Sequence, residues 1–259
     1  MSLLDQILQS TRRRVEAARA AADLRELERA AADHVVRGFR RNLVEVARLG
    51  VAVIAELKKA SPSKGLIRAE FDVAALAGEL EAAGAGALSV LTDAEYVEGS
   101  LENLRAASAA CGIPCLRKDF IVDEFQILEA RAYGADAVLL IVAGLLDGEL
   151  SALGGAAARV GLDVLCEVHD ELELTRALDA GFETIGVNNR NLKTLVVDLE
   201  TSVRLSGLMP ADVLQVAESG IESAADVARL RAAGFGAFLI GEQLMRAQRP
   251  GAELRGLLA

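Results

Sequence analysis

The first part of the chain has the hydrophobic pattern of helices. Leu3, Leu4, Ile7 and Leu8 recur at the spacing that places them on one helical face. The following stretch, residues 11–33, is rich in Ala, Arg and Glu. We therefore predict a helical N-terminal extension over residues 1–48, packed on the domain that follows it.

The pattern changes at Val51, where short apolar runs begin to alternate with amphipathic helical stretches. Near-continuous apolar runs are typical of strands in a parallel sheet that helices cover on both sides. Their alternation with helices indicates parallel β-α-β units. The predicted strands are residues 51–58, 87–92, 115–119, 137–142, 163–168, 184–189, 214–219 and 237–242.

A short internal repeat precedes every second strand. AAGAGALSV, AYGADAVLL, DAGFETIGV and AAGFGAFLI each carry a helix end, a glycine and then a strand. We predict that these glycines, Gly84, Gly134, Gly181 and Gly234, end their helices in the left-handed conformation. A two-unit module repeated over eight strands favours a closed barrel over an open sheet, although recurrent helix-capping chemistry is an alternative explanation. The predicted fold is α/β, a single (β/α)8 TIM barrel over residues 49–259 with the helical extension before it.

Composition narrows the possible partners. Aromatic residues make up 3% of the chain and Trp is absent, so the core must be aliphatic. The net charge of −10 disfavours a nucleic-acid groove, and an anionic substrate would need a local cluster of cations. The longest apolar run, Ala137 to Leu146, is too short to span a membrane.

The cysteines and the N-terminus bear on location. Cys111, Cys115 and Cys166 form an odd set without metal-ligand spacing, and we interpret them as reduced thiols. The N-terminus lacks the order of a secretory signal. Both observations predict a cytoplasmic protein.

Polar residues stand where the predicted strands end, which is where barrels of this type place their active sites. Single charges at strand ends often mark only the point where a strand meets solvent. Here they recur on several strands of one barrel, which favours a shared site. We assign His169 and Asp170 to the start of the next helix, and we treat His34 as structural. The strand-end candidates are Glu56, Lys58, Lys118, Glu167, Asn188, Arg190, Glu218, Ser219 and Gly241.

Glycine-containing turns after the last two strands predict a phosphate site. Ser219 and Gly220 precede a helix expected to begin near Glu222, and Gly241 precedes another. Backbone N–H groups at such turns bind phosphate, and the helix dipole helps them.

Lysine is scarce in this chain, and its positions are informative. The lysines are Lys58, Lys59, Lys64, Lys118 and Lys193, and every other basic residue is arginine or histidine. Arginine does not release its proton in proteins, whereas lysine does so once burial and cationic neighbours lower its pKa. We therefore predict that Lys58 and Lys118 serve in proton transfer or as a compact positive charge, and their protonation states stay open. Strand alternation places the side chains of Arg117 and Lys118 on opposite faces, and we predict that Lys118 faces the barrel interior.

Seven motifs give the chain a resemblance to one family. IAELKKASPSKG, SVLTDAEYVEGSLENL, CLRKDFIVDEFQI, CEVHDELEL, GVNNRNL, VAESGI and FLIGEQLM follow one another within residues 54–245. In this combination and order they resemble the indole-3-glycerol-phosphate synthase family of tryptophan biosynthesis. The resemblance implies a (β/α)8 barrel without metal or organic cofactor. It implies ring closure, decarboxylation and dehydration of 1-(2-carboxyphenylamino)-1-deoxyribulose 5-phosphate.

The resemblance also implies roles for individual residues. Lys118 corresponds to the general acid of ring closure, and Glu167 to the acid/base partner of the later steps, chiefly dehydration. Lys58 corresponds to a contact with the substrate's anionic groups and to a second possible proton donor. Glu56 and Glu218 correspond to orienting carboxylates. Substrate contacts are expected at Ser61, Asn188 and Arg190, and phosphate contacts at Ser219, Gly220 and Gly241.

The chain departs from the family pattern at Glu242-Gln243, where Ser or Ala is frequent, and this leaves the phosphate affinity open. We expect a monofunctional enzyme without a membrane or nucleic-acid partner; a monomer is plausible. The roles of Lys59 and Lys64 are left open between steering an anionic substrate and capping the loop. Two alternatives stay in view: a Schiff-base aldolase that uses Lys118 as nucleophile, and a non-catalytic sugar-phosphate-binding barrel.

Overall fold

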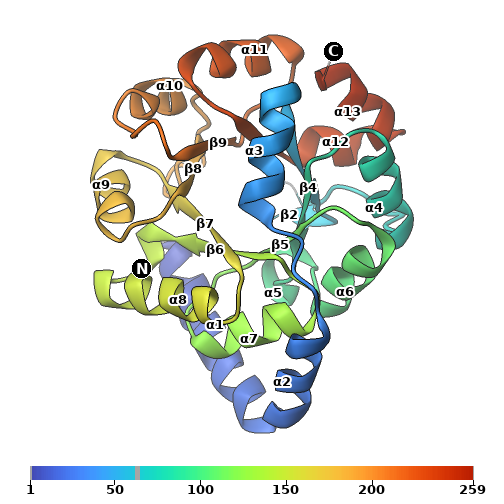
Figure 1. The fold of residues 1–259 in the computed structure, drawn as a ribbon, viewed down its shortest axis with the longest axis vertical. Coiled ribbons are helices and arrows are strands. Elements are labelled where there is room, and N and C mark those ends of the chain that lie inside the picture. Colours follow the sequence, from blue (N-terminus) through green and yellow to red (C-terminus); the bar gives the residue numbers. More distant parts are fainter. Residues whose placement is uncertain (1, 62–64, 259) are drawn as a thin grey trace.

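A closed barrel of parallel strands forms the centre of the molecule in this computed structural model, which describes residues 2–61 and 65–258 and, for Ser61, the backbone alone (Figure 1). Each strand pairs in parallel with its two neighbours, in the order β1-β10-β9-β8-β7-β6-β5-β4. The barrel strands are β1 (Ala52–Leu57), β4 (Ala87–Leu91), β5 (Cys115–Lys118), β6 (Ala137–Ile141), β7 (Asp163–Val168), β8 (Thr184–Asn188), β9 (Leu214–Glu218) and β10 (Ala237–Ile240). The eight predicted strands are confirmed, and most end one or two residues earlier than expected.

Helices precede β1 and follow the later strands, and they surround the barrel. They are α1 (Leu3–Ala21), α2 (Leu24–Asp33), α3 (Phe39–Leu49), α4 (Val73–Ala82), α5 (Ala94–Val97), α6 (Leu101–Ala110), α7 (Glu124–Ala132), the 3-10 turn η1 (Val142–Gly144), α8 (Asp147–Arg159), α9 (Glu171–Asp179), α10 (Glu200–Ser206), α11 (Ala224–Ala233), α12 (Glu242–Arg246) and α13 (Pro250–Leu258). A short antiparallel pair that the sequence did not predict, β2 (Ala60–Ser61) and β3 (Gly65–Leu66), follows β1. Of the helices in the described residues, none combines the length and apolar character needed to cross a bilayer.

The strand residues form two hydrophobic layers because successive side chains point to opposite faces. On β1, Ile54 lies in the cluster inside the barrel, whereas Val53 lies in the cluster between strands and helices. Aliphatic residues fill both layers, as the low aromatic content predicted. This two-sided burial explains why the strands appear in the sequence as nearly continuous apolar runs.

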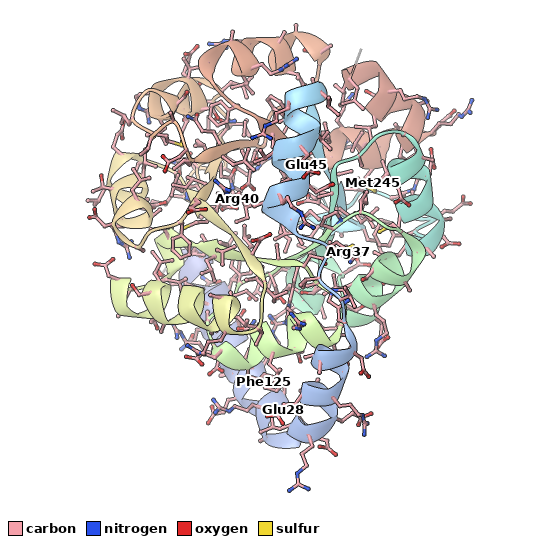
Figure 2. All side chains as sticks on the ribbon, in the orientation of Figure 1. Glu28, Arg37, Arg40, Glu45, Phe125 and Met245 are labelled. Atoms are coloured by element: carbon pink, nitrogen blue, oxygen red, sulfur yellow. The ribbon has the colours of Figure 1, made fainter. Side chains whose placement is uncertain are left out.

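Helix α3 closes the amino-terminal end of the barrel. Figure 1 shows it crossing in front of the strands. Its Phe39 and Leu43 are fully buried and belong to the inner cluster. Arg40, labelled in Figure 2, donates its backbone N–H to the carboxylate of Asp163, where β7 begins, at 2.9 Å. Two buried side chains and this anchor hold α3 over the opening.

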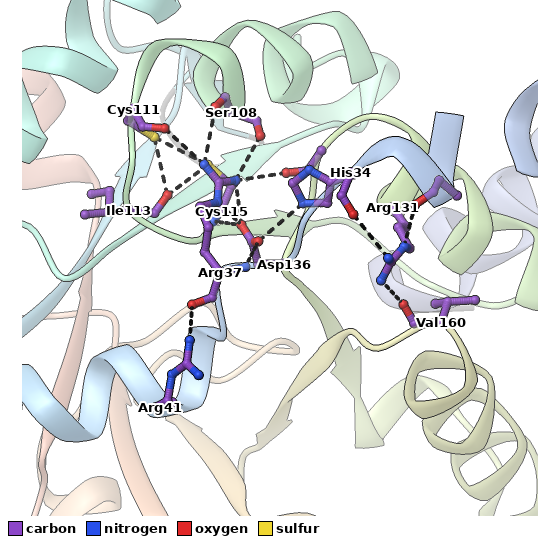
Figure 3. Close-up of polar contacts among 12 residues, drawn as sticks. His34, Arg37, Arg41, Ser108, Cys111, Ile113, Cys115, Arg131, Asp136 and Val160 are labelled. Carbon is purple, nitrogen blue, oxygen red and sulfur yellow. Dashed lines mark hydrogen bonds and ion pairs between the residues drawn. The ribbon is translucent and has the colours of Figure 1, made fainter. Parts of the chain in front are cut away.

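The segment between α2 and α3 is tied to the barrel by a buried carboxylate (Figure 3). Asp136, directly before β6, accepts hydrogen bonds from the backbone N–H and the guanidinium of Arg37, at 2.7 and 2.9 Å. It also lies 3.3 Å from His34. Burial alone would raise the pKa of Asp136, but hydrogen bonds from His34, Arg37 and Cys115 hold it below its ordinary value. His34 is therefore part of a structural anchor, in line with the interpretation from the sequence.

Helix α2 packs along α7 at the rim of the molecule. Figure 2 shows Phe125 of α7 close to Glu28 of α2. Arg131 of α7 donates hydrogen bonds to the carbonyl oxygens of Ala31 and His34, at 2.6 and 3.1 Å. These bonds join the end of α2 to the barrel helices.

Helix α1 reaches the opposite, carboxyl-terminal end of the barrel. Its Ser10 donates a hydrogen bond of 2.5 Å to Glu95 of α5, and Arg14 forms an ion pair with Asp93. Asp93 follows β4 and caps α5. The N-terminal helices thus contact both ends of the barrel, α3 at the amino end and α1 at the carboxyl end.

The glycines of the internal repeat have the predicted conformation. Gly84, Gly134, Gly181 and Gly234 have φ values of 101°, 88°, 80° and 116°. At Gly134 an added Cβ would also lie 2.8 Å from the Cβ of Ser108, so both the left-handed backbone and the close approach of α6 require glycine there.

Candidate active site

Lys118 lies at the centre of a cluster of charged side chains at the carboxyl ends of the strands. Its Nζ is 3.2 Å from Oε2 of Glu167 on β7 and 3.2 Å from Oε2 of Glu218 on β9. Its neighbour Arg117 points outward and binds Glu129 of α7 at 2.8 Å and Asp119 at 3.0 Å. The prediction that Lys118, and not Arg117, faces the barrel interior is confirmed.

The surrounding carboxylates raise the pKa of Lys118. Burial alone would lower the pKa of its ammonium group, but the negative charges of Glu218, Glu167 and Glu56 outweigh burial and raise it well above its ordinary value. The sequence left the protonation state of Lys118 open, and the nearest charged groups are carboxylates and not cations. Lys118 is therefore held as an ammonium ion.

Glu167 is buried and surrounded by groups that favour its charged form. Asn188 of β8 donates a hydrogen bond of 3.1 Å to its Oε1, and Nε2 of His169 lies 3.3 Å from the same oxygen. Burial alone would raise the pKa of Glu167, but Lys118, His169 and Asn188 hold it well below its ordinary value. Glu167 is thus a carboxylate in the resting site.

The carboxyl group of Glu218 has fewer stabilising partners than that of Glu167. Its Oε1 is buried and has no hydrogen-bond partner among the described residues. Burial raises the pKa of Glu218 to about 7, and the charge of Lys118 opposes this shift only in part. The space for its side chain depends on Gly186 of β8, because a Cβ at that position would overlap Oε1 of Glu218.

Glu56 and Lys58 form a second pair at the end of β1. Nζ of Lys58 lies 2.5 Å from Oε1 of the buried Glu56. A Cβ on Gly241 would lie 2.9 Å from Cβ of Glu56, so glycine at the end of β10 gives this carboxylate its room. Lys59 instead pairs with the half-exposed Glu98 at 2.8 Å, while Lys64 lies outside the described residues.

A cavity of about 840 Å³ opens over these groups. Glu56, Lys58, Lys118 and Glu218 contribute charged groups from the strand ends, and Asn188 and Arg190 follow at the end of β8. Further charged groups in the lining are Glu222, Glu242 and Arg246. Oδ1 of Asn188 accepts a hydrogen bond from the backbone N–H of Arg190 at 3.0 Å, which orders this corner. The strand-end candidates therefore come together, as predicted. The side chain of Ser61 lies outside the described residues.

The two glycine-containing turns line the same cavity. Ser219 and Gly220 have φ values of 64° and 78°, so both residues adopt the left-handed conformation and form a tight turn. Helix α11 begins at Ala224 with Ser223 as its cap, so the predicted start near Glu222 was early by about two residues. Helix α12 begins directly after Gly241, as expected. Gln243, at the position where the chain departs from the family pattern, also lines the cavity, and its side-chain amide donates a hydrogen bond of 2.7 Å to Glu253 of α13.

A smaller, mostly apolar cavity of about 190 Å³ adjoins the charged groups. It lies between helix α1 and the strand ends, and its polar side carries cations and carboxylates: Lys58, Lys118, Arg190, Glu56 and Glu242. The sequence did not reveal this cavity, because nothing in the pattern of α1 says which part of the barrel it covers. Its apolar walls are Leu3, Leu4, Ile7, Leu91, Val97, Phe120, Leu192 and Leu195.

His169 is a further residue that the sequence interpretation did not assign to the site. Asp170 caps helix α9 as expected, but His169 turns toward Glu167. The signal was its position two residues after Glu167, because the alternation of β7 continued one residue past Val168 directs both side chains to the same face.

Fold and cavity together define a (β/α)8-barrel enzyme with lysines and carboxylates at the carboxyl ends of its strands. A family model described as "Indole-3-glycerol phosphate synthase" matches residues 4–257. The chain belongs to this family. A protein of Koribacter versatilis named "Indole-3-glycerol phosphate synthase" is 63% identical over 257 residues, which cover 99% of each chain. One of the same name from Leptothrix cholodnii is 48% identical over 259 residues, again 99% of each chain.

Solved structures of lower identity share the fold. A mandelate oxidase structure is 20% identical, with a TM-score of 0.60, and the match covers 81% of this chain and 70% of the other. A structure described as "Native KDPGal structure" is 18% identical, with a TM-score of 0.55, over 79% of this chain and 91% of the other. At these identities the likeness supports the barrel architecture alone.

Proposed function

We propose that this chain converts 1-(2-carboxyphenylamino)-1-deoxyribulose 5-phosphate into indole-3-glycerol phosphate, CO2 and water in L-tryptophan biosynthesis, with Lys118 as the general acid. The observation that carries the assignment of roles is Lys118 itself: a buried ammonium group between two carboxylates at the edge of the cavity. Family membership supplies the reaction.

Binding an anionic substrate requires local cations, because the whole chain has a net charge of −10. Lys58, Lys118 and Arg190 provide them on one side of the cavity. On the other side, the backbone N–H groups of Ser219-Gly220 and Gly241 are the proposed phosphate ligands. The sugar phosphate then extends from the lysines toward the ends of β9 and β10. Ser61 is proposed as a further substrate contact.

The aromatic ring of the substrate fits the apolar cavity beneath α1. Ile7 and Phe120 offer an aliphatic and an aromatic wall, and Lys58, at the polar side, is suited to the ring carboxylate. In this proposal the extension of residues 1–48 contributes directly to substrate binding, while residues 49–259 supply the charged groups.

Ring closure needs a proton at the substrate's carbonyl oxygen as the ring carbon attacks the carbonyl carbon. Lys118 enters the reaction as an ammonium ion, since Glu218 and Glu167 raise its pKa. The developing alkoxide is a stronger base than a lysine amine, so the proton passes from Nζ to oxygen. The carboxylate then leaves as CO2, and its electrons restore the ring.

Dehydration needs an acid at the leaving hydroxyl and a base at the neighbouring C–H bond. Glu167 starts as a carboxylate, so it is suited to accept the carbon-bound proton first and to return a proton later. Asn188 holds its Oε1 in place. Glu56 and Glu218 orient Lys58 and Lys118, and their negative charges also stabilise the substrate amine when it carries positive charge.

The test is incubation of the purified chain with the carboxyphenylamino deoxyribulose phosphate while indole fluorescence is followed. We expect fluorescence to rise with the wild type and to stay flat with Lys118→Ala. A folded wild type that gives no product would refute the proposal.

We also propose a cytoplasmic location, because the cysteines Cys111, Cys115 and Cys166 are free thiols.

The aldolase alternative makes a different demand on Lys118. A Schiff base forms from a neutral amine, and the raised pKa of Lys118 works against that form. Borohydride treatment in the presence of a sugar phosphate separates the two reactions: a covalent adduct favours the aldolase, and an unmodified chain favours the synthase. A non-catalytic barrel that only binds sugar phosphates would bind the substrate without producing fluorescence.

A further inference from the structure

His169 stands at the mouth of the barrel with a carboxylate at each ring nitrogen. Its Nε2 lies 3.3 Å from Oε1 of Glu167, and its Nδ1 lies 2.9 Å from Oε2 of Glu173, in the first turn of α9. The backbone N–H of His169 donates to the same oxygen of Glu173, also at 2.9 Å. Asp170 accepts the backbone N–H of Glu173 and so fixes the turn that carries this carboxylate. The imidazole is therefore held by a hydrogen bond at Nδ1 and by a close ionic contact at Nε2, which has no hydrogen-bond partner among the described residues.

This geometry decides the charge of the imidazole. A carboxylate accepts hydrogen bonds and does not donate them, so Nδ1 must carry a proton toward Glu173. A neutral ring would then present a lone pair at Nε2 to the ionised oxygen of Glu167, which is repulsive at this distance. Only the ring protonated at both nitrogens suits both neighbours. His169 is therefore an imidazolium in the resting site.

The other charged groups nearby do not change this conclusion. From α9, Arg176 is directed toward Asp147 and the carbonyl oxygens of Val142 and Leu145. From β5, Lys118 approaches Glu167 through its other oxygen, Oε2. From β8, Asn188 contributes a neutral amide. Cys166 on β7 has a raised pKa because it is buried next to Glu167 and Glu173, so it stays an uncharged thiol.

We propose that His169 is a positioning residue of the synthase reaction, an imidazolium that keeps Glu167 ionised and oriented after Lys118 has given up its proton. The inference rests on the proposed function. In the resting site Glu167 has two cationic neighbours, Lys118 at one oxygen and His169 at the other. Once Lys118 has protonated the substrate, it is a neutral amine. His169 then preserves the carboxylate that the dehydration step needs as a base.

The direction of the pKa shifts agrees with this role. Burial lowers the pKa of His169, but the close contacts with Glu167 and Glu173 and the negative charges of these two carboxylates raise it to about 10. His169 also helps to lower the pKa of Glu167, although burial and the charge of Lys118 have larger effects on it. A cation that stays charged across the neutral range is suited to a constant electrostatic task and not to proton shuttling.

The kinetic test uses His169→Gln, which keeps a polar side chain of similar length and removes the charge. We expect kcat to fall about ten- to a hundredfold, less than the roughly 10²–10⁴-fold worth of a base itself, with KM nearly unchanged. Loss of the cation raises the pKa of Glu167, so the acidic limb of the kcat profile should move to higher pH by about one unit or more. An unchanged acidic limb would overturn the proposal.

The matched control is His34→Gln at the other end of the barrel. His34 also lies 3.3 Å from a buried carboxylate, that of Asp136, but far from the cavity. We expect it to affect stability and to leave the pH profile in place. Glu173→Gln is the second variant: it keeps a hydrogen-bond acceptor for Nδ1 and should shift the acidic limb in the same direction as His169→Gln, by less.

Two spectroscopic readouts need no turnover and so separate this inference from the proposed function. The chain has only 2 histidines, so His34→Gln leaves one ring to observe. Its ¹⁵N shifts should show both nitrogens of His169 protonated at pH 8. The ¹³C carboxyl titration of Glu167, identified by its loss in Glu167→Gln, should move upward in His169→Gln. A neutral ring at pH 8, or an unmoved Glu167 titration, contradicts the inference whether or not the wild type makes product.

Discussion

Glu167 and Glu218 lie at the same distance from Lys118, with each Oε2 3.2 Å from Nζ, yet their carboxyl pKa values are shifted in opposite directions. Both are buried, and burial raises the pKa of either group. Glu167 also receives the amide of Asn188 and the charge of His169, whereas Oε1 of Glu218 has no partner among the described residues. The two glutamates differ in the surroundings of Oε1, and this difference explains why their pKa values shift in opposite directions. The contact of Oε2 with Lys118 is the same in both and does not explain it.

Replacing Lys118 separates proton transfer from simple charge. Lys118→Arg keeps a cation but cannot give up a proton readily, since the pKa of arginine stays above about 12. We expect it to lose nearly as much kcat as Lys118→Ala, roughly 10²–10⁴-fold, with substrate still bound. Steady-state kinetics measures both losses, and calorimetry with a non-reacting analogue measures binding. Near-wild-type kcat in the Arg variant would assign Lys118 an electrostatic role only.

The two glutamates should differ in their effect on turnover. Glu167→Gln removes the proposed base while keeping the shape of the side chain, so we expect kcat to fall roughly 10²–10⁴-fold with little change in substrate affinity. Glu218→Gln should be milder, because its proposed role is orientation. Steady-state kinetics at one pH compares them. A Glu167→Gln variant within about tenfold of the wild type removes Glu167 from the mechanism.

The titration of Glu218 should also make the stability of the protein depend on pH. Its pKa is raised from 4.5 in the unfolded chain to about 7 in the folded protein, so between these values the folded state binds more protons. The contribution of Glu218 to the free energy of unfolding is therefore fully present below pH 4.5 and is lost as pH rises through about 7. Glu218→Gln lacks this loss. The free energy of unfolding of Glu218→Gln, relative to that of the wild type, should therefore rise by about 3 kcal/mol between pH 4.5 and pH 8, which is the size that the raised pKa implies.

Urea unfolding of both proteins at pH 5 and at pH 8 measures this difference. The wild type and Glu218→Gln should be closest in stability at the lower pH. Equal gaps at the two pH values would show that Glu218 does not titrate between them.

Gly241 serves two proposed purposes, and a larger side chain there should disturb both. A Cβ at this position meets Glu56, and it also blocks close approach of the phosphate to the backbone. We expect Gly241→Val to raise KM and, through the displaced Glu56 and its partner Lys58, to lower kcat as well. The control is Gly207→Val, where φ is −65° and an added Cβ meets no described atom within 4 Å. An unchanged KM in Gly241→Val counts against the phosphate site.

Helix α1 should affect substrate binding through its buried face. Ile7 is 4% exposed and lines the apolar cavity beside Lys118. Ile7→Ala enlarges that cavity and removes contact with the aromatic ring, so we expect KM to rise severalfold. Val35→Ala, at a side chain that is 82% exposed, is the control and should leave KM as it is. If both variants bind substrate like the wild type, the ring does not occupy this cavity.

Much of the architecture follows from local pattern. Near-continuous apolar runs of four to six residues are enough to locate the strands, because each strand is buried on both faces. The left-handed glycines such as Gly234 are likewise predictable, since a helix end with a positive φ favours glycine whatever lies around it. The inward direction of Lys118 follows from alternation along β5. These features depend on a few neighbouring residues, and the sequence displays them directly.

The charge states of the site depend instead on residues far apart in the chain. Lys118 and Glu218 are separated by 100 positions, and Glu167 lies 49 positions from Lys118. Motifs placed all three at the barrel mouth, but only the closed barrel brings two carboxylates to one ammonium group and so raises the pKa of that group. Electrostatic energies vary with distance and burial, and neither is a property of a short segment. For the same reason, only tertiary packing assigned α3 and α1 to opposite ends of the barrel and turned His169 toward Glu167.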